Sequence, residues 1–272
     1  MAPSQPPTER LSAAAEVAAA QNDGKIHLLL AASGSVATIK MPLIAASFAQ
    51  VPNLSIRVIL TANAAEFLQG QAGEQPRFDS AALRGLPNVD AVYVGDADEW
   101  HPRWTRGAPI LHIELRRWAH LLVVAPLSAN VLAKITNGLC DSLLTSVIRA
   151  WDTDPAAGKR ILVAPSMNTA MWNHPLTARQ LATLRDDWGV KTTTTTTTVG
   201  TATAAASSTA AAQDSRETVE ENRGWYEVLL PASKALACGD VGPGAMMEWR
   251  DIVVIIRERL NLPADYFTET QT

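Results

Sequence analysis

The chain has 272 residues, of which 47% are hydrophobic and 18% charged, and its formal net charge is −4. These values are typical of a globular protein long enough to bury a core, and without a basic stripe nucleic acid is a disfavoured partner. The two cysteines, Cys140 and Cys238, are too few for a disulfide framework. No apolar run approaches the roughly 20 residues that span a bilayer, and the first 23 residues resemble neither a secretory nor a transit signal. We therefore expect a cytoplasmic protein.

Short apolar runs mark the predicted strands, which in chain order are Ile26–Ala32, Ile56–Leu60, Leu121–Ala125 and Ile161–Ala164. Each run is apolar throughout, as in parallel strands that are covered on both faces. Helical sequence follows each run, to about residue 50, after 61–63, over 129–139 and over 176–188. This repetition predicts a doubly wound parallel α/β sheet in a single domain, with ligands outside the carboxyl ends of the strands.

The domain organisation follows from composition. We expect residues 1–24 to be a disordered tail, 25–260 the folded domain and 261–272 a C-terminal tail. Thr192–Thr198 is a run of seven threonines, and sequence rich in Thr, Ala and Ser continues to Ala212. Because such sequence buries too little apolar surface to offset its ordering entropy, we expect a disordered insertion over about 192–224.

Small polar loops follow the predicted strands. Gly34-Ser35-Val36 leads into a helix N-terminus, where exposed amides and the helix dipole can hold a phosphate, although an ordinary tight turn has the same sequence. The sequence has no G-x-G-x-x-G pattern and no Walker lysine, so a mononucleotide fits better than NAD or ATP. Thr61 and Ser128-Ala129-Asn130 end two other strands. Ser128 and Asn130 are good helix caps, but we expect the three loops to converge on one edge of the sheet.

Two further side chains, His112 and Asn168, have both a structural and a chemical interpretation. His112 lies beside apolar residues and is either a structural histidine or a base near neutral pH. Asn168, flanked by Met167 and Met171, either caps a helix or holds a carboxylate.

A glycine-rich segment, Ala237–Met246, contains three glycines and Cys238. Glycines let a loop fold over a ligand and bring backbone amides to it. We expect Cys238 to be a reactive thiol, and Cys140 to be an inert residue inside a helix.

Six segments, in this order, resemble the flavoprotein cysteine decarboxylases, and most closely those that act on 4′-phosphopantothenoylcysteine. The segments are Ala32–Ala37, His112–Trp118, Ala125–Asn130, Gly138–Thr145, Pro165–Trp172 and Ala237–Met246. The resemblance covers about residues 25–190 and 226–257.

The resemblance implies a flavodoxin-like fold, a homotrimer, and FMN near the subunit interface, with no metal ion. His112 would be the catalytic base, Cys238 the proton donor, and Asn168 the residue that holds the substrate carboxylate. The implied FMN-binding residues are Gly34, Ser35, Val36, Thr61, Asn63, Ser128, Ala129, Asn130, Val131 and Ser166. The further implied substrate contacts are Met171, Ala237, Gly239, Asp240, Gly242 and Gly244.

The implied activity converts 4′-phosphopantothenoylcysteine to 4′-phosphopantetheine, a step in coenzyme A biosynthesis. Direct loss of CO2 from the cysteine carboxyl would leave a carbanion with no electron sink. Oxidation of the thiol by FMN would give a thioaldehyde that accepts those electrons as CO2 departs. The electrons then return to the product, so the enzyme would be a lyase with no net redox change.

The sequence departs from the family pattern at three positions, where Asn63 replaces a Ser, Val131 a Thr and His120 an Asp. Val131 lacks a hydroxyl near the implied flavin. The histidine and the cysteine-containing loop disfavour a flavin prenyltransferase, and the loop disfavours a peptidyl-cysteine decarboxylase. A regulatory paralogue that binds a protein phosphatase, or one part of a hetero-trimeric decarboxylase, is the remaining alternative. The presence of His112, Asn168 and Cys238 in one chain favours the enzyme.

Overall fold

The computed structural model describes residues 11–69, 79–198, 216–230, 234–235, 241–242 and 244–266. Its centre is a six-stranded sheet with the order β3-β2-β1-β4-β5-β8, and every neighbouring pair is parallel. The strands are β1 Ile26–Ala32, β2 Leu54–Leu60, β3 Val89–Val94, β4 Leu121–Leu127, β5 Arg160–Pro165 and β8 Tyr226–Val228. The chain winds outward through β2 and β3, then returns to β4 and winds the other way. The predicted doubly wound α/β fold is therefore confirmed, with the strand order of a Rossmann sheet.

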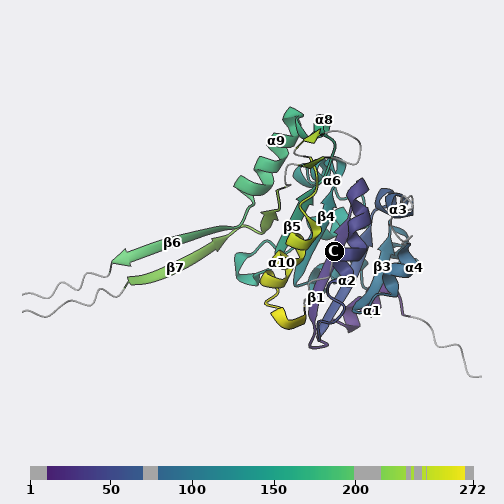
Figure 1. Ribbon diagram of the computed structural model, residues 1–272. Helices are drawn as coiled ribbons and strands as arrows, with labels where there is room; N and C mark the ends of the chain where they lie inside the picture. The colour runs from purple at the N-terminus through teal and green to yellow at the C-terminus, as the bar shows by residue number, and fades with distance from the viewer. Residues whose placement is uncertain are drawn as a thin grey trace, which may run out of the picture.

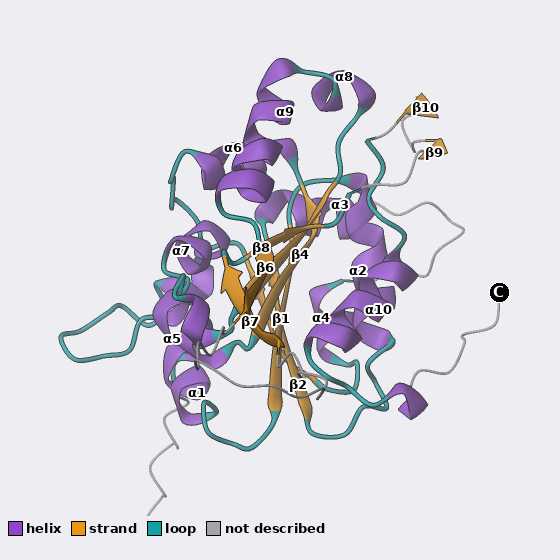
Figure 2. Cartoon of the chain, turned by 90° about the vertical axis from the view of Figure 1, so that its left-hand side faces the viewer, coloured by secondary structure: helices purple, strands orange, loops and turns teal. Residues whose placement is uncertain are grey.

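Helices cover both faces of this sheet (Figure 2), so the strands are buried from two sides. Core residues of α2 and α10 pack on one face, and those of α1, α5, α6, α7 and α9 pack on the other. The helices are α1 Ala13–Ala19, α2 Met41–Ala46, α3 Ala62–Gln69, α4 Ser80–Arg84, α5 Leu111–Trp118, α6 Ala129–Thr136, α7 Leu143–Arg149, α8 Thr169–Trp172, α9 Pro175–Ala182 and α10 Trp249–Arg259. Shorter helical turns are η1 Val36–Lys40, η2 Ala97–Glu99, η3 Pro155–Ala157, η4 Thr183–Asp187 and η5 Ala264–Tyr266. In the described part of the chain, none of these helices has the length and apolarity to cross a membrane.

The central strand β1 shows why the sequence pattern is continuous rather than alternating. Leu28 and Leu30 belong to the core under α2 and α10, whereas Leu29 and Ala31 belong to the core under α5 and α7. All four side chains are fully buried. Successive side chains on a strand point to opposite faces, so a strand covered on both sides is apolar at every position.

The N-terminal region is a correction to the expected tail. Residues 1–10 lie outside the described residues, but Ser12 caps helix α1 by accepting a hydrogen bond from the amide of Ala15 at 3.2 Å. Ala14 and Val17 are buried on the α1 face that packs against α5. The Ala-rich sequence that was expected to be a tail is a good helix former with an apolar stripe, and the domain therefore begins before residue 25.

The threonine tract differs from the expectation of disorder. Strand β6, Lys191–Thr198, pairs antiparallel with β7, Arg216–Arg223, and the two form a ribbon that projects away from the sheet (Figure 1). Residues 199–215 of the expected insertion lie outside the described residues. Threonine is β-branched and suits a strand, and the ladder provides hydrogen bonds without a buried core.

The base of this ribbon is closely held. The backbone oxygen of Trp188 accepts hydrogen bonds from the amides of Trp225 and Tyr226, at 2.9 and 3.1 Å. Gly224 has φ +83, and a Cβ on it would lie 2.1 Å from the oxygen of Gly189. The two strands of the ribbon therefore leave and re-enter the domain at nearly the same point.

The C-terminal part of the domain also extends further than expected. Leu262, in the expected C-terminal tail, is 6% exposed and belongs to the core, while residues 267–272 lie outside the described residues. An ion cluster holds the last helix in place. Glu227 on β8 accepts hydrogen bonds from Arg160 on β5, at 2.6 Å, and from Arg259 on α10, at 2.8 Å. Burial alone would raise the pKa of Glu227, but the hydrogen bonds from Arg259 and Arg160 outweigh that effect and lower it.

We predict that Glu227→Gln lowers the free energy of unfolding by about 2–3 kcal/mol, because two cations lose their charged partner. A carboxyl with a lowered folded-state pKa contributes stability that is present above its unfolded pKa, about 4.3, and is lost as the pH falls through its folded value. The fall in melting temperature between about pH 5 and pH 3 should therefore be smaller in Glu227→Gln than in the parent. Glu66→Gln, at an exposed glutamate, is the matched control, and equal acid sensitivity of parent and Glu227→Gln would contradict the role of this cluster.

Candidate functional site

Two neighbouring cavities lie outside the carboxyl ends of the strands, where the chain leaves the paired strands β1 and β4. The larger has a volume of about 420 Å³ and the smaller about 250 Å³. Gly34, Ser128 and Asn130 line both. This edge between β1 and β4 is the point where a doubly wound sheet binds its ligands.

Serine hydroxyls connect the loops beneath these cavities. The Ser33 hydroxyl donates to the oxygen of Pro126 at 3.0 Å and accepts from the amide of Ser128 at 2.7 Å, which joins the ends of β1 and β4. The Ser35 hydroxyl donates to Ser166 Oγ at 3.0 Å, which joins the ends of β1 and β5. The loops therefore form one connected edge, as their sequences predicted.

Glycine is required at position 34 because the backbone there lies too close to Asn63 for a side chain, and not because of a left-handed backbone conformation. A Cβ on Gly34 would lie 2.8 Å from the Cβ of Asn63, closer than two such atoms can pack. The turn after β1 therefore lies directly against the start of α3, and a side chain at position 34 would displace Asn63 and enter the region where the two cavities meet.

The larger cavity brings the predicted substrate residues to the loops of the predicted phosphate seat. Asn168, Met171 and Gly244 line it together with Ser35 and Ser166. The remaining predicted residues on its wall are Val36 and Ala129. Gly34 and Asn168 are 134 positions apart in the sequence. The predicted phosphate-binding turn and the residue expected to hold a carboxylate therefore line the same cavity.

Asn168 caps a helix, as one of its two sequence interpretations predicted, and it also lines the larger cavity. Its Oδ1 accepts a hydrogen bond from the amide of Met171 at 2.8 Å and so caps α8. Among the described residues its Nδ2 has no hydrogen-bond partner, and the side chain is exposed and lines the cavity. Gly244 holds the opposite wall close, because its oxygen accepts from the amide of Met167 at 3.0 Å and a Cβ on it would lie 2.2 Å from the Met167 oxygen.

The smaller cavity has a more polar rim. Thr61, Asn63 and Val131 line it, and Thr61 Oγ1 accepts a hydrogen bond from the amide of Ala64 at 3.2 Å. Val131 is 5% exposed, and its amide donates to Ser128 Oγ at 3.3 Å. The valine therefore keeps the helix cap, and only the side-chain hydroxyl of the family pattern is missing.

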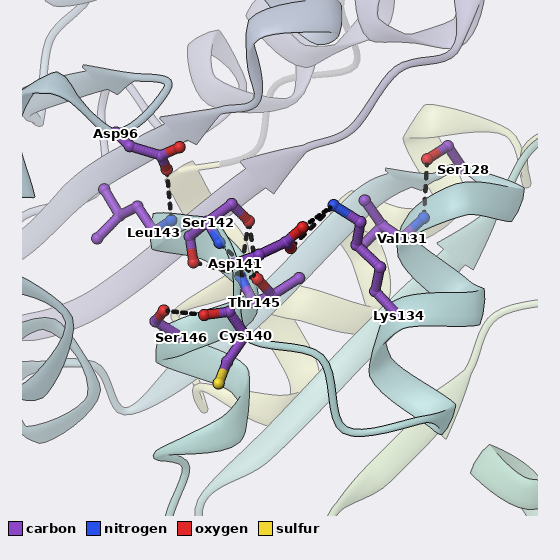
Figure 3. A network of polar contacts seen from close by, with 10 residues as sticks. All are labelled: Asp96, Ser128, Val131, Lys134, Cys140, Asp141, Ser142, Leu143, Thr145 and Ser146. Atoms are coloured by element: carbon purple, nitrogen blue, oxygen red, sulfur yellow. Dashed lines mark hydrogen bonds and ion pairs between the residues drawn. The ribbon is translucent and has the colours of Figure 1, made fainter.

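An ion pair and a helix cap that the sequence did not indicate complete this rim (Figure 3). Lys134 Nζ contacts both carboxylate oxygens of Asp141, at 2.8 and 2.7 Å, and this hydrogen bond lowers the pKa of Asp141. Asp96 Oδ1 accepts from the amide of Leu143 at 2.6 Å, and Ser142 caps α7. Asp141, Ser142 and Leu143 belong to the segment 138–145, which carried part of the family resemblance without an assigned role, and Lys134 and Asp96 bind to it.

Cys140 is a correction. It lies in the loop between α6 and α7 and is exposed, not inside a helix. Helix α6 ends at Thr136, Gly138 takes a positive φ of 73°, and Ser142 starts the next helix. The glycine and the serine cap are the signals that could have predicted this break.

His112 stands apart from the rest of the predicted site. His112 lies at the start of α5, lines neither cavity, and contacts Glu99 through its ring nitrogen Nδ1 at 2.6 Å. Gly242 lies in β10, Val241–Gly242, which pairs with β9, Lys234–Ala235. Ala237, Cys238, Gly239 and Asp240 lie outside the described residues.

The larger cavity also has residues that were not predicted. Met246, Met247, Trp249, Ile39 and Phe67 make its wall largely apolar. Lys40 lines the same cavity and has no ion-pair partner among the described residues. None of these positions stands out in the sequence, because their shared wall forms only when α10 packs beside α2.

A family model described as "Flavoprotein" matches residues 16–261. The chain belongs to the flavoprotein family. A phosphopantothenoylcysteine decarboxylase of Mus musculus is 37% identical over 237 residues, which cover 87% of this chain and 88% of the mouse protein. A probable thymidylate synthase of Schizosaccharomyces pombe is 40% identical over 240 residues, but the chain spans only 30% of that protein's length.

Solved structures give the same fold. A mutant PPC decarboxylase in complex with pantothenoylaminoethenethiol is 38% identical, with a TM-score of 0.61 over 86% of this chain and 97% of that one. The FMN binding protein AtHal3 is 37% identical, with a TM-score of 0.60 over 91% of this chain and 99% of that one.

The residues at the two cavities suit a flavin. The hydroxyls of Ser35 and Ser166 and the amides at the start of η1 are hydrogen-bond donors for a phosphate. The apolar wall of the larger cavity offers a surface for an aromatic ring system. In the described residues no cluster of side chains could hold a metal ion.

We predict that Gly34→Leu yields a folded but colourless protein, because the new side chain enters the region where the two cavities meet. Flavin content is measured from the visible spectrum, and folding from the melting curve. Gly85→Leu is the control, since Gly85 is exposed, has φ −77 and lines neither cavity. A full complement of flavin in Gly34→Leu would place the cofactor elsewhere.

Proposed function

We propose that this flavoprotein binds FMN and decarboxylates 4′-phosphopantothenoylcysteine to 4′-phosphopantetheine. The observation that carries the proposal is the shared cavity of Asn168 and the Gly34–Val36 turn, because it would hold a phosphate-bearing cofactor beside a carboxylate-binding amide. The named activity of the mouse relative, which this chain matches over most of both lengths, adds support.

The residues of the two cavities would bind different parts of the cofactor. Ser35, Ser166 and the amides after Gly34 would hold the FMN phosphate, while Thr61, Asn63 and Asn130 would contact the rest of the cofactor from the smaller cavity. When bound, FMN supplies a reversible two-electron acceptor for the substrate thiol.

The same cavity offers complementary groups for the substrate. The Nδ2 donors of Asn168 would hold the cysteine carboxylate, and Met171, 52% exposed, would cover its apolar part. The ammonium group of Lys40 would face the phosphate at the other end of the substrate, because it is a cation on the cavity wall without a partner among the described residues.

The acid–base steps are assigned to two residues. His112 would take the thiol proton as the thioaldehyde forms, and CO2 would then leave from the carboxylate on Asn168. Cys238 would protonate the carbon that lost CO2, which neighbours the sulfur-bearing carbon to which the hydride returns. In this scheme the chain gains no net proton or electron over one turnover.

His112 lines neither cavity of its own chain, so the base must reach the substrate from elsewhere. We propose a homotrimer with the cofactor near the subunit interface, in which His112 of one copy faces the cavity of the next. A head-to-tail ring of three identical copies satisfies this arrangement without a second type of chain.

Mixed assemblies test this arrangement. We predict that His112→Asn and Asn168→Asp each retain FMN but do not release CO2 when expressed alone. Co-expression should restore activity, because about a quarter of the sites in randomly assembled trimers combine an intact His112 with an intact Asn168. Absence of recovery, with mixed trimers shown by mass spectrometry, would mean that both residues act within one copy.

The final step tests the decarboxylase assignment itself. We predict that Cys238→Ser still releases CO2 but does not form phosphopantetheine, because a thiol with a reference pKa of about 8.5 gives up a proton far more readily than a serine hydroxyl. Mass spectrometry should find a product about two mass units lighter than phosphopantetheine, whose missing hydrogens remain on the flavin. Cys140→Ser, at the exposed second cysteine, is the matched control. Formation of phosphopantetheine at the parent rate would remove Cys238 from the mechanism.

A further inference from the structure

Glu99 contacts His112 at two points. One carboxylate oxygen of Glu99 lies 2.6 Å from His112 Nδ1, and the other accepts a hydrogen bond from the His112 backbone amide at 3.1 Å. The side chain of Glu99 is 5% exposed, whereas that of His112 is 25% exposed. A buried carboxylate therefore holds a partly exposed imidazole by both its ring and its backbone.

Helix α5 explains why this contact is fixed. Ile110, the residue before the helix, offers no side-chain cap, so the amides of the first turn need an acceptor from elsewhere. Glu99 supplies it from η2, which packs against α5 and α1. The helix dipole favours a negative charge at this end, and the carboxylate is held there independently of any ligand.

The contact also determines which ring nitrogen is available. An ionised carboxylate can only accept hydrogen bonds, so His112 Nδ1 must be the protonated nitrogen. The Nε2 atom then carries a lone pair, and among the described residues it has no hydrogen-bond partner. It is the atom of this ring that can take a proton from a molecule outside the chain.

We propose that Glu99 is a positioning residue that keeps His112 in the tautomer with a basic Nε2 and stabilises the imidazolium formed when Nε2 takes a proton. The catalytic part rests on the proposed function of His112 as the base. In that step the S–H bond of the substrate breaks, its proton forms an N–H bond at Nε2, and Glu99 remains a carboxylate throughout. Glu99 contacts neither substrate nor cofactor in this scheme.

The tautomer is measured without any reaction. The chain has five histidines, and the ring nitrogens of His112 are assigned in ¹⁵N-histidine-labelled holoprotein by the signals lost in His112→Asn. At about pH 9, above the reference imidazole pKa of about 6.5, we expect Nδ1 protonated and Nε2 unprotonated. In Glu99→Ala the signals should shift towards the Nε2–H form, which free histidine prefers. A parent already in the Nε2–H form, or a tautomer unchanged in Glu99→Ala, would overturn the proposal.

Activity separates positioning from simple helix capping. Glu99→Gln keeps an acceptor for the amide of His112 but removes the charge, so we expect FMN retention, a KM within about twofold, and a rate of CO2 release lowered about 10- to 100-fold. Asp79→Asn is the control, because Asp79 caps α4 through the amide of Ala82 at 2.7 Å and lines neither cavity. A parent rate in Glu99→Gln would show that Glu99 only caps the helix.

The two readouts also separate this proposal from the proposed function. If His112→Asn released CO2 at the parent rate, the base assignment would fail, while the tautomer result would still show whether Glu99 sets the state of the ring. If His112→Asn leaves only a residual rate of CO2 release, measured with high enzyme over long incubations, and Glu99→Gln does not lower that residual rate, Glu99 acts through His112. A further loss there would show that Glu99 acts on the reaction by another route.

Discussion

The site depends on the hydrogen bonds of one fully buried hydroxyl, that of Ser33. The Ser33 hydroxyl donates to the backbone oxygen of Pro126 on β4 and accepts from the amide of Ser128. The backbone oxygen of Ser33 accepts from the hydroxyl of Thr38 at 3.3 Å. Where the direction of winding changes, the chain leaves β1 and β4 in separate loops, and the polar backbone of those loops needs partners. Ser33 provides these hydrogen-bond partners with a small side chain that lines neither cavity. The ends of β1 and β4 are therefore joined, and the space outside them stays free for a ligand. Both cavities lie on this junction.

The sequence allowed the central strands and the converging loops to be predicted because their physical causes are local. A strand buried on both faces must be apolar throughout, as β1 is. The glycine at position 34 indicates a close backbone contact, which the structure shows with Asn63. The edge strand β3 was missed because its apolar run is interrupted near its start by Asp90, which is exposed and follows the buried Val89. Strand β8 is only three residues long, which is too short for a periodic signal.

The features that sequence reasoning missed arise from packing between distant elements. Lys134 and Asp141 meet because α6 ends at a glycine turn, and Glu99 reaches His112 because η2 packs against α5. A resemblance identifies residues that perform chemistry but not the side chains that orient them. The helix α1 was missed for a different reason, since an alanine-rich segment has little apolar bulk and its burial depends on the partner helix α5.

The close contact between the two ends of the β6–β7 ribbon affects which insertions and deletions this protein can accept. Trp188 accepts hydrogen bonds from both Trp225 and Tyr226, so the chain leaves the domain and returns to the sheet across a gap closed by backbone contacts. Whatever length of sequence lies between these points, the ends meet the domain in the same geometry, and lengthening a loop raises its closure entropy only slowly. A threonine gained or lost in the run 192–198 would alter the ribbon and leave the order of the six central strands intact. The same junction is a natural place to graft a tag or a second domain onto this flavoprotein.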